Sequence, residues 1–172
     1  MRPAFRPSLA LGALPVLALG LVLTAPAAQA LPHGTCFMAE GAALDARPAR
    51  DDVARLTLRF DLVDGHGFAI VALHFGDGAR AQAEGVAGQV YDNAFFCGDG
   101  TLQLCDGDDD SGGFAFDGPA ADGLRLRSDY LALIRVIEDG TDFTHVDLTD
   151  WTDPPGGWFH LAPTDPADCE GA

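Results

Sequence analysis

The alternation of apolar and polar residues between Val53 and Val63 is the strongest constraint on the fold. Apolar side chains occupy every second position of this stretch, at Ala54, Leu56, Leu58, Phe60 and Leu62. A period of two is typical of a β-strand that buries one face. Turn-forming residues follow at 64–67, and a second apolar run occupies 68–75. The sequence therefore predicts an antiparallel hairpin over residues 53–75.

Shorter strand patterns separated by Gly/Asp-rich breaks fill the rest of the chain. They lie at 89–97, 101–105, 113–116, 124–127, 130–137, 143–148 and 158–161. The only helical pattern is a weak one over 45–55. Many short strands without a long amphipathic helix indicate an all-β chain. We expect a single antiparallel β-sandwich or small β-barrel domain, stapled by disulfides.

The first thirty residues have the pattern of an export signal. Arg2 and Arg6 provide a basic start, an apolar stretch covers 9–24, and Ala28-Gln29-Ala30 has the small-x-small form of a cleavage site. An uncleaved membrane anchor is the alternative, but no basic stop signal follows the apolar stretch. The pattern predicts Sec-type export to the periplasm or the medium, with cleavage before Leu31.

The predicted signal divides the chain into a cleaved signal peptide, residues 1–30, and one exported β-rich domain, residues 31–172. At this length one domain buries about two-thirds of the surface of its unfolded chain. Within it, 31–49 is expected to be an N-terminal arm and 163–172 a C-terminal tail.

The four cysteines all follow the predicted signal, and an oxidising compartment favours disulfides. Four cysteines allow three pairings. Cys97 and Cys105 flank a Gly-Asp-Gly turn, whereas Cys36 and Cys169 lie near the two ends of the exported chain. We therefore predict one bridge that closes a hairpin, Cys97–Cys105, and one that ties the ends together, Cys36–Cys169.

The charge of the chain restricts its partners. The formal charge is −16, and it becomes −18 once the two arginines of the signal are removed. Such a field repels phosphate backbones and anionic lipid headgroups. We expect no nucleic-acid partner and no stable membrane association after signal cleavage. We therefore expect the partner to be a protein or a small-molecule ligand, whose identity the sequence does not give.

The densest polar feature is the acidic segment 105–113. Asp106, Asp108, Asp110 and Asp117 stand at the first, third, fifth and twelfth positions of a calcium-loop pattern. Ser111 replaces the glycine of the sixth position, and the flanks have strand rather than helix patterns. The segment predicts either a loop that binds Ca²⁺ through these four carboxylates or a solvated acidic turn.

Motifs for catalysis are sparse. No serine lies in a Gly-x-Ser-x-Gly elbow, and no Lys-containing phosphate loop is present. Three histidines on predicted strands, His74, His145 and His160, would form a metal site only if the fold brought them together. The sequence favours an exported non-catalytic β-domain that acts as a binding or interaction module. The alternative is a small periplasmic or secreted hydrolase that uses paired carboxylates.

Overall fold

The structure is a computed structural model, which describes residues 33–40, 51–63, 66–98, 104–108, 110–117, 123–136, 143–151 and 158–170. These residues form nine strands: β1 (Thr35–Glu40), β2 (Val53–Val63), β3 (His66–Phe75), β4 (Val90–Cys97), β5 (Leu104–Asp106), β6 (Gly112–Asp117), β7 (Leu124–Val136), β8 (Phe143–Asp147) and β9 (Trp158–Thr164). Short helices accompany them: α2 (Ala79–Glu84), η1 (Leu148–Trp151) and η2 (Pro166–Cys169). The predicted signal and residues 45–50 of the weak helical pattern lie outside the described residues, whereas residues 53–55 of that pattern belong to β2 and not to a helix.

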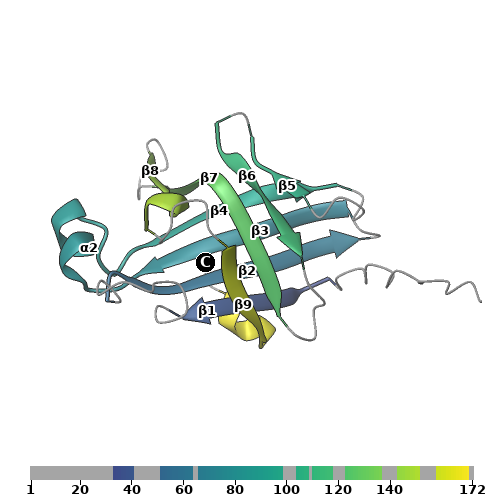
Figure 1. Cartoon of the computed structure of the whole chain (residues 1–172), viewed down its shortest axis with the longest axis horizontal. Helices are drawn as coiled ribbons and strands as arrows, with labels where there is room; N and C mark the ends of the chain where they lie inside the picture. The colour runs from purple at the N-terminus through teal and green to yellow at the C-terminus, as the bar shows by residue number, and fades with distance from the viewer. Residues whose placement is uncertain are drawn as a thin grey trace, which may run out of the picture.

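The strands close into an antiparallel barrel. Pairing runs from β1 through β2, β3, β4, β5 and β6 to β7, and β9 then joins β7 back to β1. β8 pairs with the second half of β7, beyond the residues that pair with β9. Strands β7 and β9 cross steeply over β1–β4 (Figure 1). The all-β prediction is confirmed, and of the two architectures left open by the sequence the barrel is the one observed.

The barrel interior is filled by the alternating apolar residues. Phe60 is fully buried on β2 and packs edge-on against Phe37 of β1 and tilted against Phe116 of β6. Phe95 of β4 packs against Phe114 of β6, which in turn contacts Phe116. Each buried phenylalanine contributes about 1.5–3 kcal/mol relative to an exposed position. The period of two in the sequence therefore places these aromatic side chains on the inner face.

Both predicted disulfides are present. Cys97 and Cys105 are register partners on β4 and β5, and their Cα atoms are 4.1 Å apart. Cys36 and Cys169 have Cα atoms 6.2 Å apart and are separated by 133 residues in sequence. The described cysteines include no free thiol. Two disulfides indicate an oxidising environment, either extracellular or periplasmic.

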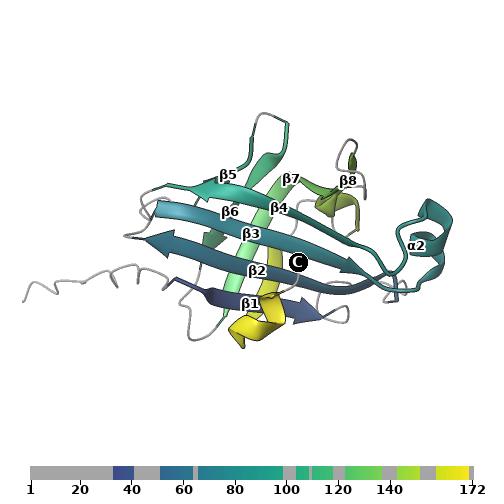
Figure 2. The same ribbon diagram turned by 180° about the vertical axis from the view of Figure 1, so that it is seen from behind.

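The expected arm and tail contain more regular structure than the sequence suggested. Part of the arm forms β1, which pairs with both β2 and β9 and therefore helps to close the barrel. The tail begins within β9 and continues as η2, which packs on the outside of β1 and β2 (Figure 2). The disulfide from Cys36 to Cys169 fixes η2 in this place.

The sequence did not predict the helix α2. Its first turn is stabilised by a residue that is distant in sequence. Asp52 is buried, and its Oδ1 accepts a hydrogen bond of 3.0 Å from the amide of Ala81. This carboxylate takes the place of the local side-chain cap that Gly78 lacks. Arg80 then lies 4.0 Å from the ring centroid of Trp151, so α2 also contacts η1. No helix in the described part of the chain is long and apolar enough to span a membrane.

Candidate functional site

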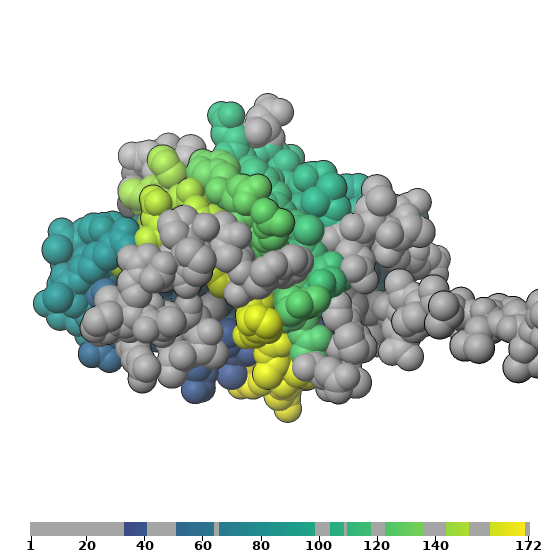
Figure 3. Space-filling view, in the orientation of Figure 1, coloured from purple at the N-terminus to yellow at the C-terminus, as the bar shows by residue number. Residues whose placement is uncertain are grey.

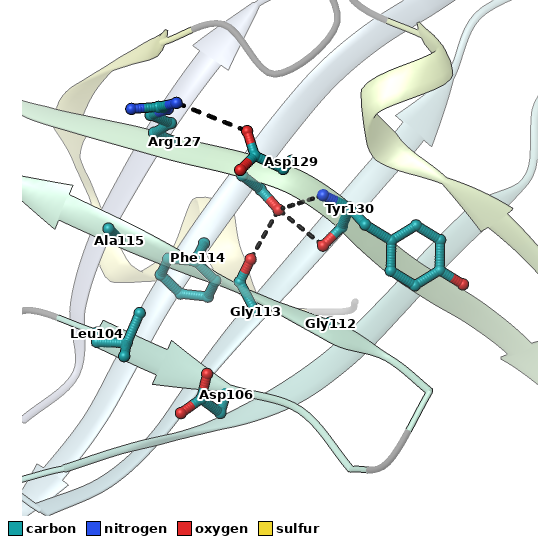
Figure 4. Close-up of a pocket in the computed structure, with 10 residues that line it drawn as sticks. Leu104, Asp106, Gly112, Gly113, Phe114, Ala115, Arg127, Asp129 and Tyr130 are labelled. Carbon is teal, nitrogen blue, oxygen red and sulfur yellow. Dashed lines mark hydrogen bonds and ion pairs between the residues drawn. The ribbon is translucent and has the colours of Figure 1, made fainter.

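A groove with a volume of about 490 Å³ lies on the outer wall of the barrel, where β5, β6 and β7 meet. Its lining residues are Leu104, Asp106, Gly112, Gly113, Phe114, Ala115, Arg127, Ser128, Asp129 and Tyr130. Figure 4 shows the β5 side chains on one side of the Gly112–Gly113 backbone and the β7 side chains on the other. The residues of β6 and β7 also lie side by side in the space-filling view (Figure 3).

The groove is located at a bulge in β7. The sequence predicted two strands, at 124–127 and 130–137, but the structure has one strand in which Ser128 and Asp129 together oppose a single residue, Phe114. Ser128 Oγ lies 2.7 Å from the carbonyl oxygen of Gly113, and it accepts a hydrogen bond from the amide of Tyr130. The buried serine thus holds the bulge, and a bulge redirects neighbouring side chains.

Two glycines of β6 allow the neighbouring strands to approach closely at the groove. Gly112 has a φ of +70°, and a Cβ atom there would collide with the carbonyl oxygen of Tyr130. A Cβ atom at Gly113 would lie 2.7 Å from both Asp106 Oδ1 and the carbonyl oxygen of Cys105. A side chain at either position would therefore force the backbone or its neighbours to move, so the two glycines are required by this local structure.

The polar side chains around the groove differ in their partners. Arg127 and Asp129 form an exposed ion pair of 3.7 Å. Asp106 is exposed, and its carboxylate has no hydrogen bond or ion pair with another described residue. Tyr130 is 42% exposed. The groove therefore presents one unpaired negative charge and one aromatic ring to solvent.

Two exposed phenylalanines continue from the groove across the sheet. Phe68 on β3 and Phe96 on β4 are 51% and 53% exposed, and their ring centroids are 5.9 Å apart at an interplanar angle of 76°. The strand registers place six residues in one continuous line across β2 to β7: Asp61, Phe68, Phe96, Asp106, Gly113 and Tyr130. We call this line the outer row.

The structure separates one of the four aspartates of the calcium-loop pattern from the others. Asp106 ends β5, Asp108 and Asp110 belong to the β5–β6 connection, and all three are exposed. Asp117 lies at the far end of β6 and forms two hydrogen bonds with Arg125, of 2.7 and 2.5 Å. Four positions separate it from Gly113, the register partner of Asp106, or about 13 Å along the strand.

No group of three or more Asp, Glu, His or Cys residues suited to a metal ion occurs in the described parts of the chain. The predicted four-carboxylate arrangement is therefore not formed there, and calcium binding by the acidic loop stays a prediction. The turn is closed instead by backbone hydrogen bonds from Gly107 to Gly112 and from Ser111 to Asp108.

The three strand histidines lie on different parts of the barrel. His145 pairs with Ile134 on β7, and His160 pairs with Arg125, whereas His74 pairs with Arg55 on β2. They do not form a common site. His74 is half-buried, and its Nε2 atom is buried without a hydrogen-bond partner among the described residues. Burial, with a smaller effect of the Arg55 guanidinium, lowers the pKa of His74 from 6.5 to about 4.

We expect His74 to make the protein less stable in mild acid. The unfolded chain takes up a proton near pH 6.5, but the folded state resists protonation until about pH 4, so stability falls as the pH falls through this interval. The full interval corresponds to about 3 kcal/mol. Because the side chain is only half-buried, solvent screening reduces the expected loss to ~1–2 kcal/mol.

Urea unfolding of wild type and His74→Leu between pH 7 and pH 4.5 measures this contribution. The wild type should lose the additional stability, and the leucine variant should not. Burial raises the pKa of Asp92 on the neighbouring strand, which gives the opposite slope. Asp92→Asn in both backgrounds removes that contribution. Parallel pH profiles for the wild type and the leucine variant would contradict the assignment.

The sequence did not reveal the outer row. Phe68 and Phe96 were placed on predicted strands, but their partnership depends on the register between β3 and β4. Phe68 lies seven positions from the buried Phe75, and Phe96 lies one position from the buried Phe95. Because side chains alternate between the two faces of a strand, an odd spacing from a buried residue places both phenylalanines on the outer face.

Comparison of the chain with protein-family models, with curated protein sequences and with solved structures gives no match.

Proposed function

We propose that this chain is an exported, non-catalytic binding module that holds its ligand in the groove and along the outer row. The observation that carries this proposal is the exposed aromatic pair, Phe68 and Phe96, in direct register with a groove lined by Asp106 and Tyr130. Large exposed aromatic side chains beside a concave surface are typical of recognition sites. Export through the predicted signal accounts for the disulfides.

The rest of the barrel is suited to a scaffold role. The interior is packed with fully buried phenylalanine and leucine side chains, one disulfide joins β4 to β5, and the other joins β1 to η2. A site on regular strands keeps its geometry before the ligand arrives, which lowers the entropic cost of binding. The residues of the outer row come from six consecutive strands of the closed barrel.

The alternative is a small hydrolase with paired carboxylates. Asp106 and Asp129 both border the groove, which is the feature that keeps this alternative open. However, Asp129 is paired with Arg127, and the hydroxyl of Ser128 is buried and bonded to the backbone. No histidine lines the groove. These features favour binding over acid–base or nucleophilic chemistry.

The proposed function is tested by NMR mapping on the oxidised protein with three probes: a basic peptide, an acidic peptide and a neutral hexasaccharide. We expect at least one probe to shift the amide signals of Gly113 and Tyr130 in a saturable way, and to be recovered intact. If all three probes leave these signals unchanged, the groove is not a binding site. Hydrolysis of a probe that is lost in Asp106→Asn would establish the hydrolase instead.

A further inference from the structure

The apolar surface on the outer wall is concentrated rather than scattered. Five large hydrophobic side chains are exposed among the described residues: Val63, Phe68, Phe96, Leu104 and Tyr130. Phe68 and Phe96 form the aromatic pair, while Leu104 and Tyr130 line the groove beside it. Four of the five therefore belong to one continuous surface over β3 to β7. Single exposed hydrophobic residues need no explanation, but a contiguous group on a monomer indicates a site of interaction.

The charges on this surface are arranged in a specific order. In the outer row, Asp61 stands directly beside Phe68, and Asp106 stands directly beside Phe96. Asp61 is already neutralised by Arg59 at 3.0 Å. The carboxylate of Asp106 is not, and the exposed Asp108 follows it in the same turn. The aromatic pair is therefore bordered, on the groove side, by uncompensated negative charge.

We propose that the outer row docks an extended, arginine- or lysine-containing segment of a partner protein; this rests on the proposed binding function. A basic side chain would lie in the groove, whose lining includes Asp106 and Tyr130. Its aliphatic stem would contact Leu104, and the next apolar side chain of the segment would contact Phe68 and Phe96. Cations are attracted both by carboxylates and by the faces of aromatic rings.

The dimensions and the charge both fit such a segment. Measured along the curved barrel surface, six positions on neighbouring strands span five spacings of about 4.8 Å, or roughly 24 Å. About seven extended residues that follow this curve have the same length. The chain as a whole carries a formal charge of −16. This field attracts a basic partner and repels an acidic one, and it raises the rate of association most at low salt.

A neutral sugar fits the same surface less well. Stacking on a sugar needs an aromatic face that lies open and flat, whereas the rings of Phe68 and Phe96 meet edge to face at 76°. The unpaired carboxylate of Asp106 also remains without a counter-charge when the ligand is neutral. The combination of edge-to-face rings with free negative charge therefore favours the basic polypeptide.

The test uses a seven-residue peptide in which arginine and valine alternate, with both ends blocked, titrated against the oxidised protein at low salt. Two further peptides replace arginine by serine or by glutamate, and a neutral hexasaccharide is the fourth probe. Amide shifts of Gly113 and Tyr130 locate the binding, and their titration gives Kd. We expect binding of the arginine peptide only, with an affinity that falls as salt is added.

Matched variants separate this site from general attraction to an acidic protein. Asp106→Asn should weaken binding of the arginine peptide by about 2–5-fold, while Asp77→Asn, an exposed aspartate before α2, should leave Kd unchanged. Phe96→Leu keeps an apolar side chain but removes the ring, and should weaken binding by about 2–5-fold. Equal effects of Asp106→Asn and Asp77→Asn would mean non-specific charge attraction and would overturn the proposal.

The other outcomes are also decisive. Equal binding of the arginine and serine peptides would show that the site does not select a cationic segment, and it would overturn the proposal. If the hexasaccharide alone shifts Gly113 and Tyr130, the basic-peptide inference fails while the proposed binding function stands. If none of the four probes shifts these signals, both fail together.

Discussion

Replacing Cys36 and Cys169 together by alanine is expected to lower the free energy of unfolding by ~4–5 kcal/mol. This bridge closes a loop with a sequence separation of 133 residues, so it restricts the unfolded chain strongly. It also holds η2 against β1 and β2. Urea unfolding under non-reducing conditions measures the change.

The second disulfide provides the matched control. Cys97 and Cys105 are separated by only 8 residues, and loop entropy predicts a loss of only ~2–3 kcal/mol for their replacement by alanine. All four cysteines are buried, but Cys97 and Cys105 also belong to the main hydrophobic core, so lost packing adds to the cost of replacing the short bridge rather than the long one. A larger loss for the long bridge therefore reflects the length of the closed loop. A larger loss for the short bridge would contradict the loop-entropy explanation.

The parts of the fold that the sequence predicted correctly share one physical origin. The predicted bounds of β2 are unchanged, and the period of two holds from Leu56 to Leu62, where each apolar position is buried. Ala54 is exposed instead, because the register shifts between Val53 and Arg55. The cysteine pairings were also correct, since their positions left one pairing in which a hairpin and the two ends are each closed. Local pattern and chain geometry were sufficient in both cases.

Other elements depend on contacts that no local pattern contains. The strand β1 lies in a segment with weak alternation, and it becomes a strand because both β2 and β9 pair with it. The six-residue α2 is too short to show a helical period, and its start is capped by Asp52, 29 residues away in sequence. Tertiary contacts therefore determine these two elements.

The candidate site also depends on tertiary contacts that the sequence pattern does not contain. The sequence directed attention to four aspartates, but the register sends Asp117 to the far end of β6, where Arg125 neutralises it. The groove instead arises from the bulge at Ser128, which the sequence presented only as a break between two strands. A one-residue difference in strand pairing cannot be read from composition or spacing.

Replacing Phe60 by alanine is expected to lower the free energy of unfolding by about 3–5 kcal/mol, whereas replacing Phe68 by alanine should cost about 1 kcal/mol or less. Phe60 is fully buried between Phe37 and Phe116, so its removal leaves a cavity in the barrel. Phe68 is 51% exposed and loses mainly its contact with Phe96. Urea unfolding of both variants at pH 7 gives the comparison.

The contrast bears on why the outer phenylalanines are present. Phe60 and Phe68 are themselves close register neighbours, since Phe60 pairs with Ala69 and Asp61 pairs with Phe68. They therefore share the same two strands and differ mainly in the face they occupy. A small stability cost for Phe68→Ala, together with weaker binding of the arginine peptide, would assign the outer ring to recognition. A cost as large as that of Phe60→Ala would instead make the ring part of the fold's own packing, and the outer row would lose its functional basis.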